Sequence, residues 1–155
     1  MNAEVSASAA PGAGEQAKLK YAHEIKQVCD CPPASSQSVD CYAYRFAFDK
    51  LDKSFTPVAL FNPQMTVSGR PVAHCCEGYS LSMFDTLEQL RKRARAGLDR
   101  APNFLKRIGD HFVRIKLTAL DGIRTPSSSN GHFEFFEAAT FDGPSRSLAH
   151  ARLFP

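Results

Sequence analysis

Five residues in three separate stretches of this chain carry side chains that can bind an anion or assist bond cleavage: Arg45, Ser80, Ser82, Glu134 and Glu137. Arg45 alternates with a row of aromatic residues, so on an extended segment its charge faces away from them and must reach water, a carboxylate or a phosphate. Ser80 and Ser82 are two residues apart, which places both hydroxyls on one face of a strand. Glu134 and Glu137 are three apart and point to opposite faces, so at most one can share a site with the serines.

In this order, the arginine, the serine-x-serine pair and the glutamate resemble elements of ADP-ribosyltransferases. In that family arginine and serine hold NAD, and the glutamate stabilises the ribosyl cation and orients the acceptor. The resemblance implies an NAD-using enzyme in which Arg45, Ser80 and Ser82 bind NAD and one glutamate is catalytic. NAD is the one cofactor that the sequence suggests, and only under this interpretation. The alternative is structural: Arg45 forms a pair or extends to solvent, the serines precede a helix, and the glutamates lie on the surface.

A basic segment between residues 91 and 107 is the second candidate site. It contains seven basic residues against one acid, a net charge of +6, whereas the whole chain totals +3. Such a helical face attracts phosphates or an acidic protein surface without reading sequence. The basic residues are Arg91, Lys92, Arg93, Arg95, Arg100, Lys106 and Arg107.

The alternative interpretation of this segment is a solvated helix exterior, because a helix with one buried face needs a polar opposite face. No zinc-finger spacing, aromatic RNP string or basic zipper accompanies the charge. We therefore expect a small binding or regulatory module that acts through residues 91–107, on an acidic protein or nucleic acid. An ADP-ribosyltransferase-like enzyme is the alternative.

Cysteine and histidine residues form the third set: Cys29, Cys31, Cys41, His74, Cys75 and Cys76. They are numerous enough for a zinc site, but one residue separates the first pair and none separates the last, whereas zinc knuckles need two. We therefore expect ordinary thiols and no metal site. An odd count of five cysteines argues against a complete disulfide framework and favours a reducing, cytoplasmic location.

Two further arrangements could support catalysis. Cys75 or Cys76 could act as a nucleophile with His74 or His111 as base, although adjacent residues diverge on an extended chain. Asp110-His111 and His132 could also approach one another across neighbouring strands and form a cleft.

The elements that position these residues follow from hydrophobic period and turn chemistry. The apolar spacing predicts helices over 16–28, 87–98 and 103–110, the second with a capping box from Asp85 to Glu88. Alternating or apolar runs predict strands at 41–48, 78–84, 112–117 and 132–137, with 55–60 pairing back as an edge. Three phenylalanines in 132–137 predict that this strand is central and that Phe135 is buried.

Clustered strands and clustered helices predict an α+β fold, not a regular alternation. We expect a mostly antiparallel sheet of about five strands with two to three helices, formed by residues 16–155. Residues 1–15 have almost nothing large to bury and are expected to form a disordered tail. The start has no signal-peptide pattern and no run of about 18 apolar residues occurs, so we expect neither secretion nor a membrane partner.

Overall fold

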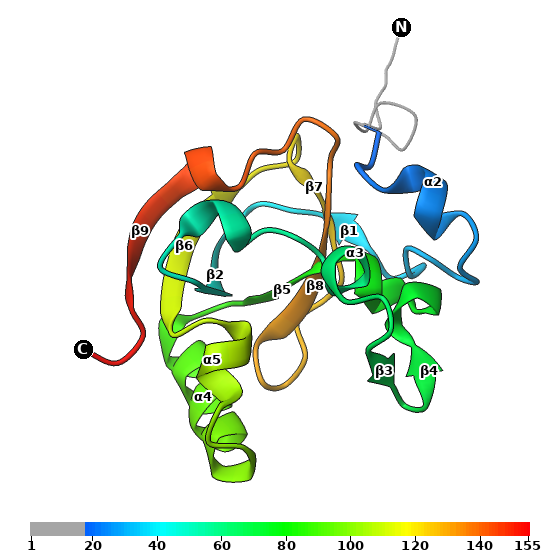
Figure 1. Cartoon of the computed structure of the whole chain (residues 1–155). Coiled ribbons are helices and arrows are strands. Elements are labelled where there is room, and N and C mark those ends of the chain that lie inside the picture. The colour runs from blue at the N-terminus through cyan, green and yellow to red at the C-terminus, as the bar shows by residue number, and fades with distance from the viewer. Residues whose placement is uncertain (1–17) are drawn as a thin grey trace, which may run out of the picture.

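The computed structural model describes residues 18–155 (Figure 1). The expected tail, 1–15, lies outside the described residues. In the described part, one antiparallel sheet has seven strands in the order β1-β7-β8-β5-β2-β6-β9. In chain order these strands are β1 (Gln37–Ser38), β2 (Cys41–Ala47), β5 (Leu81–Phe84), β6 (His111–Leu117), β7 (Gly122–Arg124), β8 (His132–Glu137) and β9 (Ser147–Arg152).

Four α-helices and a small hairpin surround this sheet in the described residues. The helices are α2 (Ala22–Ile25), α3 (Val58–Phe61), α4 (Leu87–Arg100) and α5 (Phe104–Ile108), and the hairpin pairs β3 (Thr66–Val67) with β4 (Arg70–Pro71). Short 3-10 turns occupy Leu51–Lys53, Val72–His74, Cys76–Tyr79 and Pro144–Arg146. Figure 1 shows α4 and α5 together on one side, with α2, α3 and the hairpin on the side away from β6 and β9. The mixed α+β class is confirmed, but the sheet is larger than expected.

The sheet buries both faces over part of its area. One face carries the main core, which includes Ala43, Leu81, Val113, Phe133 and Phe135. On the other face, Leu90 and Ala94 of α4 pack over aromatic residues of the sheet. The aromatic row of β2 therefore lies under the helix, and the small residues of β2 face the main core. Tyr42, at the uncovered end of that row, is 48% exposed.

Helix α4 matches the predicted apolar stripe, but its cap lies one residue later than expected. Thr86 is the N-cap, and its side-chain oxygen accepts a hydrogen bond from the backbone N–H of Gln89 at 3.1 Å. Asp85 contacts Ser127 and Arg124 instead, because it still belongs to the turn that leaves β5. The predicted Asp85–Glu88 capping box is therefore wrong.

Two other predicted elements differ from the structure because long-range pairing or proline geometry decides them. Residues 16 and 17 of the expected helix lie outside the described part of the chain, and over 18–28 only α2 is helical, since Leu19 forms a β-bridge with Ala138 and the Lys20 N–H donates to the Glu137 carbonyl. The strand expected over 55–60 is replaced by α3, which starts after Pro57. Proline suits a helix start because its fixed φ matches the first turn.

Strand β8 is central, with β7 on one side and β5 on the other, and Phe135 is fully buried, as predicted. Phe135→Ala should cost about 3–5 kcal/mol of unfolding free energy, because it removes buried apolar surface and leaves a cavity. Denaturant unfolding measures this cost. The control is Phe61→Ala, since Phe61 is 63% exposed and its truncation should change stability by no more than about 0.5 kcal/mol. Equal costs for the two variants would contradict the described core.

Candidate functional site

The basic segment forms a pair of helices whose packing depends on one glycine. A Cβ atom on Gly97 would lie 2.4 Å from the ring of Phe104, so the bare backbone of α4 is what allows α5 to pack against it. Gly109 ends α5 with a φ of +112°, a conformation that L side chains rarely adopt, and leads directly into β6. The two helices thus form one compact unit at the start of β6.

Three of the seven basic side chains have structural contacts. The Arg91 Nε donates to the Leu153 carbonyl at 2.9 Å. Arg93 lies over the ring of Phe104 at 4.9 Å, and Arg95 lies over the ring of Phe154 at 5.3 Å. These contacts attach α5 and the C-terminal residues to α4 through hydrogen bonding and cation–π attraction.

The other four basic side chains are exposed and, in the described part of the chain, make no hydrogen bond, ion pair or cation–π contact. None of the seven basic side chains of the segment pairs with a carboxylate among residues 18–155. We call the four uncommitted residues the basic face: Lys92, Arg100, Lys106 and Arg107. Their charge is available to a partner without breaking any contact within the fold.

A second polar cluster lies on β5 and β8, where Ser82 and Glu134 are opposite each other in the sheet. The Ser80 hydroxyl donates a hydrogen bond to Glu134 Oε1. His132 Nε2 lies 3.0 Å from Ser82 Oγ and 3.3 Å from Glu134 Oε2. The four residues form one hydrogen-bonded cluster: Ser80, Ser82, His132 and Glu134. Their separations are short enough for proton transfer among hydroxyl, imidazole and carboxylate.

Arg45 and Glu137 do not join this cluster. Arg45 lies on the main-core face, in the register position of Val113, and its guanidinium donates to the carbonyls of Ser54 at 2.7 Å and Ser82 at 2.9 Å. Glu137 is buried and accepts a hydrogen bond from Lys20 Nζ at 2.7 Å. Burial raises the pKa of Glu137, and the Lys20 ammonium acts in the opposite direction. Of the predicted arginine, serine and glutamate set, the structure brings together Ser80, Ser82 and Glu134.

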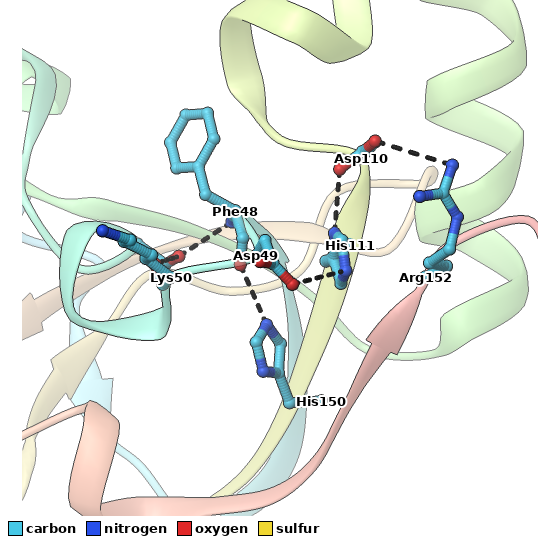
Figure 2. Close-up of polar contacts among 8 residues, drawn as sticks. Phe48, Asp49, Lys50, Asp110, His111, His150 and Arg152 are labelled. Atoms are coloured by element: carbon cyan, nitrogen blue, oxygen red, sulfur yellow. Dashed lines mark hydrogen bonds and ion pairs between the residues drawn. The ribbon is translucent and has the colours of Figure 1, made fainter.

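A histidine cluster that sequence reasoning did not assemble lies at the start of β6 (Figure 2). His111 Nδ1 is 2.8 Å from Asp110 Oδ1, and its Nε2 is 3.4 Å from Asp49 Oδ1. The ring of His150 on β9 faces it at 5.3 Å between centroids, and Arg152 lies 3.8 Å from Asp110. The hydrogen bond with His111 lowers the pKa of Asp110, and Arg152 acts in the same direction. Adjacency of Asp110 and His111 was visible in the sequence, but the approach of Asp49 and β9 was not.

The predicted approach of His111 to His132 is wrong. Their strands, β6 and β8, are separated in the sheet by β5 and β2. The two histidines therefore belong to separate clusters. His111 is also remote in the fold from Cys75, which is buried and directs its Sγ toward the Pro71 carbonyl at 3.5 Å.

The expectation of free thiols is wrong for two of the cysteines. Cys31 and Cys76 form a disulfide across 45 residues of sequence, so Cys76 is not a free nucleophile. Cys29, Cys41 and Cys75 remain thiols. Within residues 18–155, no three histidine, cysteine, aspartate or glutamate side chains gather closely enough to hold a metal ion.

Comparison with known proteins supplies no family. No family model matches the chain, and no curated protein or solved structure shows significant similarity to it. In the described part of the chain, every helix is too short or too polar to cross a bilayer. The functional assignment therefore depends on the geometry of the chain itself.

The lowered pKa of Asp110 gives a pH-dependent prediction. A carboxylate with a lowered folded-state pKa stabilises the fold above its unfolded pKa of about 4, and this contribution is lost as the pH falls through the folded value. Asp110→Asn should therefore lower the melting temperature by a few degrees near neutral pH, and the difference from the wild type should close in acid. Asp49→Asn should have a smaller effect, because Asp49 is 90% exposed and farther from His111. A difference that persists unchanged at low pH would contradict a charge-based role for Asp110.

Proposed function

We propose that the protein is a small binding module that holds an acidic polypeptide segment against the basic face of α4 and α5. The observation that carries the proposal is the presence of four exposed cations without any contact in the described chain: Lys92, Arg100, Lys106 and Arg107. Each such cation keeps its full charge for a partner, whereas a cation that already has a carboxylate nearby is largely neutralised.

The spacing of the charges supports a single contact surface. Lys92 and Arg100 are eight residues apart, about 80° around the helix axis at 3.6 residues per turn, and so lie on one side of α4. The ring of Phe104 places α5, with Lys106 and Arg107, next to this side. The surface therefore extends across both helices.

An acidic polypeptide is favoured over single-stranded nucleic acid by the state of the aromatic rings. Proteins that bind single strands stack bases on exposed aromatic side chains within a basic groove. Here Phe104 is covered by Arg93 and Phe154 by Arg95, so neither ring is free for a base. An acidic polypeptide needs no free ring, because its carboxylates bind to the charged side chains alone.

The test compares two variants of equal net charge. Lys92→Gln/Arg100→Gln/Lys106→Gln/Arg107→Gln neutralises the basic face and keeps good helix formers. The control, Lys18→Gln/Lys26→Gln/Lys50→Gln/Lys53→Gln, removes four exposed cations elsewhere. Fluorescence anisotropy with labelled polyglutamate measures binding, and labelled oligodeoxythymidine is the second probe.

Neutralising the basic face should weaken polyglutamate binding about tenfold. Four screened ion pairs of roughly 0.4 kcal/mol each add to about 1.6 kcal/mol, and about 1.4 kcal/mol of binding free energy corresponds to tenfold in Kd. The control should bind like the wild type, and added salt should weaken the wild-type complex. Equal losses in both variants would show an effect of net charge alone. If the wild type binds oligodeoxythymidine more tightly than polyglutamate, and neutralising the basic face abolishes that binding, the partner is a nucleic acid and not an acidic polypeptide.

NAD-dependent transfer is a second candidate, favoured by the contact between Ser80 and Glu134 beside Ser82 on adjacent strands. The position of Arg45 on the opposite face counts against it. Under this candidate, Glu134→Gln should abolish nicotinamide release from NAD, because no carboxylate would remain to stabilise the ribosyl cation. Glu88→Gln is the control, because Glu88 is exposed on α4. Absence of nicotinamide release by the wild-type protein would remove this candidate.

A further inference from the structure

A cavity of about 410 Å³ lies where the segment after α2 meets the β3–β4 hairpin and the turns that follow it. Three cysteines line it, Cys29, Cys75 and Cys76, together with the charged residues Asp30, Arg70 and Glu77. Its volume is within the range of small-molecule sites, roughly 300–1,000 Å³. It is separate from the basic face and from both polar clusters, and nothing in the proposed function uses it.

The sulfur atoms at this cavity have different environments. Cys76 lines the cavity and is joined by a disulfide to Cys31. Cys31 does not line the cavity and packs instead against the apolar cluster that contains Ile25 and Tyr79. Cys29 is an exposed thiol on the cavity wall, two residues before Cys31, and its Sγ donates to Asp30 Oδ2 at 3.5 Å. The disulfide-bonded Cys76 and the free thiol Cys29 therefore line the same space.

We propose that this cavity is a thiol–disulfide exchange site, in which Cys29 attacks Cys76 and displaces Cys31. The Cys29 thiolate donates an electron pair to Cys76 Sγ, and the Cys29–Cys76 bond forms. The Cys31–Cys76 bond breaks with its electron pair on Cys31 Sγ, which takes up a proton in place of the one that Cys29 released to water. The step exchanges one disulfide for another and needs no oxidant or reductant.

The arrangement suits such a step for two reasons. Exchange requires the attacking and the attacked cysteine to share one accessible space, and Cys29 and Cys76 line the same cavity, whereas Cys31 is not among its lining residues. The segment that carries Cys29 and Cys31 is also held independently, because Lys20 binds Glu137 and Leu19 pairs with Ala138. Moving the disulfide partner of Cys76 from Cys31 to Cys29, two residues earlier, therefore leaves the attachment of this segment intact.

The same cavity can admit a low-molecular-weight thiol, since its lining is polar and includes Asp30, Arg70, His74 and Glu77. Such a thiol attacks Cys76 Sγ, forms a mixed disulfide and releases Cys31 as thiolate. Cys29 then attacks Cys76 Sγ, expels the small thiolate and completes the same exchange. Glutathione has this chemistry and serves as the probe.

The experiment maps disulfides in the full chain after equilibration with reduced and oxidised glutathione, acid quenching and alkylation. Cleavage before aspartate separates Cys29 from Cys31, because Asp30 lies between them. The wild type should yield both Cys31–Cys76 and Cys29–Cys76 peptides, Cys29→Ser only the first, and Cys31→Ser mainly the second. Cys75→Ala should leave this pattern unchanged, which identifies Cys76 and not its neighbour as the attacked residue.

Two results would overturn the proposal. One is a Cys31→Ser protein in which Cys29 stays alkylated while Cys76 is free or bound to glutathione. The other is a wild-type protein that yields no Cys29–Cys76 peptide at any glutathione ratio. The wild-type measurement decides the matter even where the Cys31→Ser variant does not fold.

Discussion

The connection between the two parts of the sheet depends on Arg45. Strands β2 and β5 are joined in register at one residue pair, Tyr44 opposite Phe84, whereas β2 pairs with β6 along its whole length. The guanidinium of Arg45 donates to the carbonyl of Ser82 across this weak junction and to Ser54 in the loop beyond. Burial lowers the pKa of Arg45 to about 10, which still leaves it charged near neutral pH. Charged donors make stronger hydrogen bonds than neutral ones, so the bond from Arg45 to Ser82 reinforces the short ladder between β2 and β5.

Helix α4 closes the same junction from the other face. Its buried residues Leu90 and Ala94 pack in a cluster with Tyr44, Phe46 and Phe84, which come from the two poorly paired strands. The ring of Phe46 also meets Phe104 of α5 edge to face at 6.2 Å. The helix pair that carries the basic face is therefore supported by the sheet, and its outer surface is left to the charged residues.

The C-terminal residues link the basic helices to the histidine cluster. The Leu153 N–H donates to the Asp110 carbonyl at 2.9 Å, and its own carbonyl accepts from Arg91. Asp110 in turn contacts His111 (Figure 2). The histidine cluster and α4 thus both contact Leu153, so a change in charge at the cluster affects a residue that α4 also binds.

Elements with a strong period were predictable from the sequence, and those that depend on distant partners were not. The alternation in 41–48, the phenylalanines of 132–137 and the apolar stripe of 87–98 correspond to β2, β8 and α4. Strands β1 and β7 have two and three residues, too few to show a period. The Cys31–Cys76 bond and the Asp49–His111 contact join residues far apart in sequence, so no local pattern indicates them. The basic segment was visible as a charge run, but the roles of Arg91 and Arg95 required the position of the C-terminal residues.

The ion pair between Lys20 and Glu137 sets a limit on how short this domain can be made. The Glu137 side chain is 1% exposed, and its second oxygen has no partner in the described chain. A fragment that begins after Lys20 would keep every strand yet leave this carboxylate buried without its cation, a state that proteins avoid by protonating the group or by opening the structure. Lys20 is thus a required part of the folded unit for an electrostatic reason, although it precedes β1 in the chain.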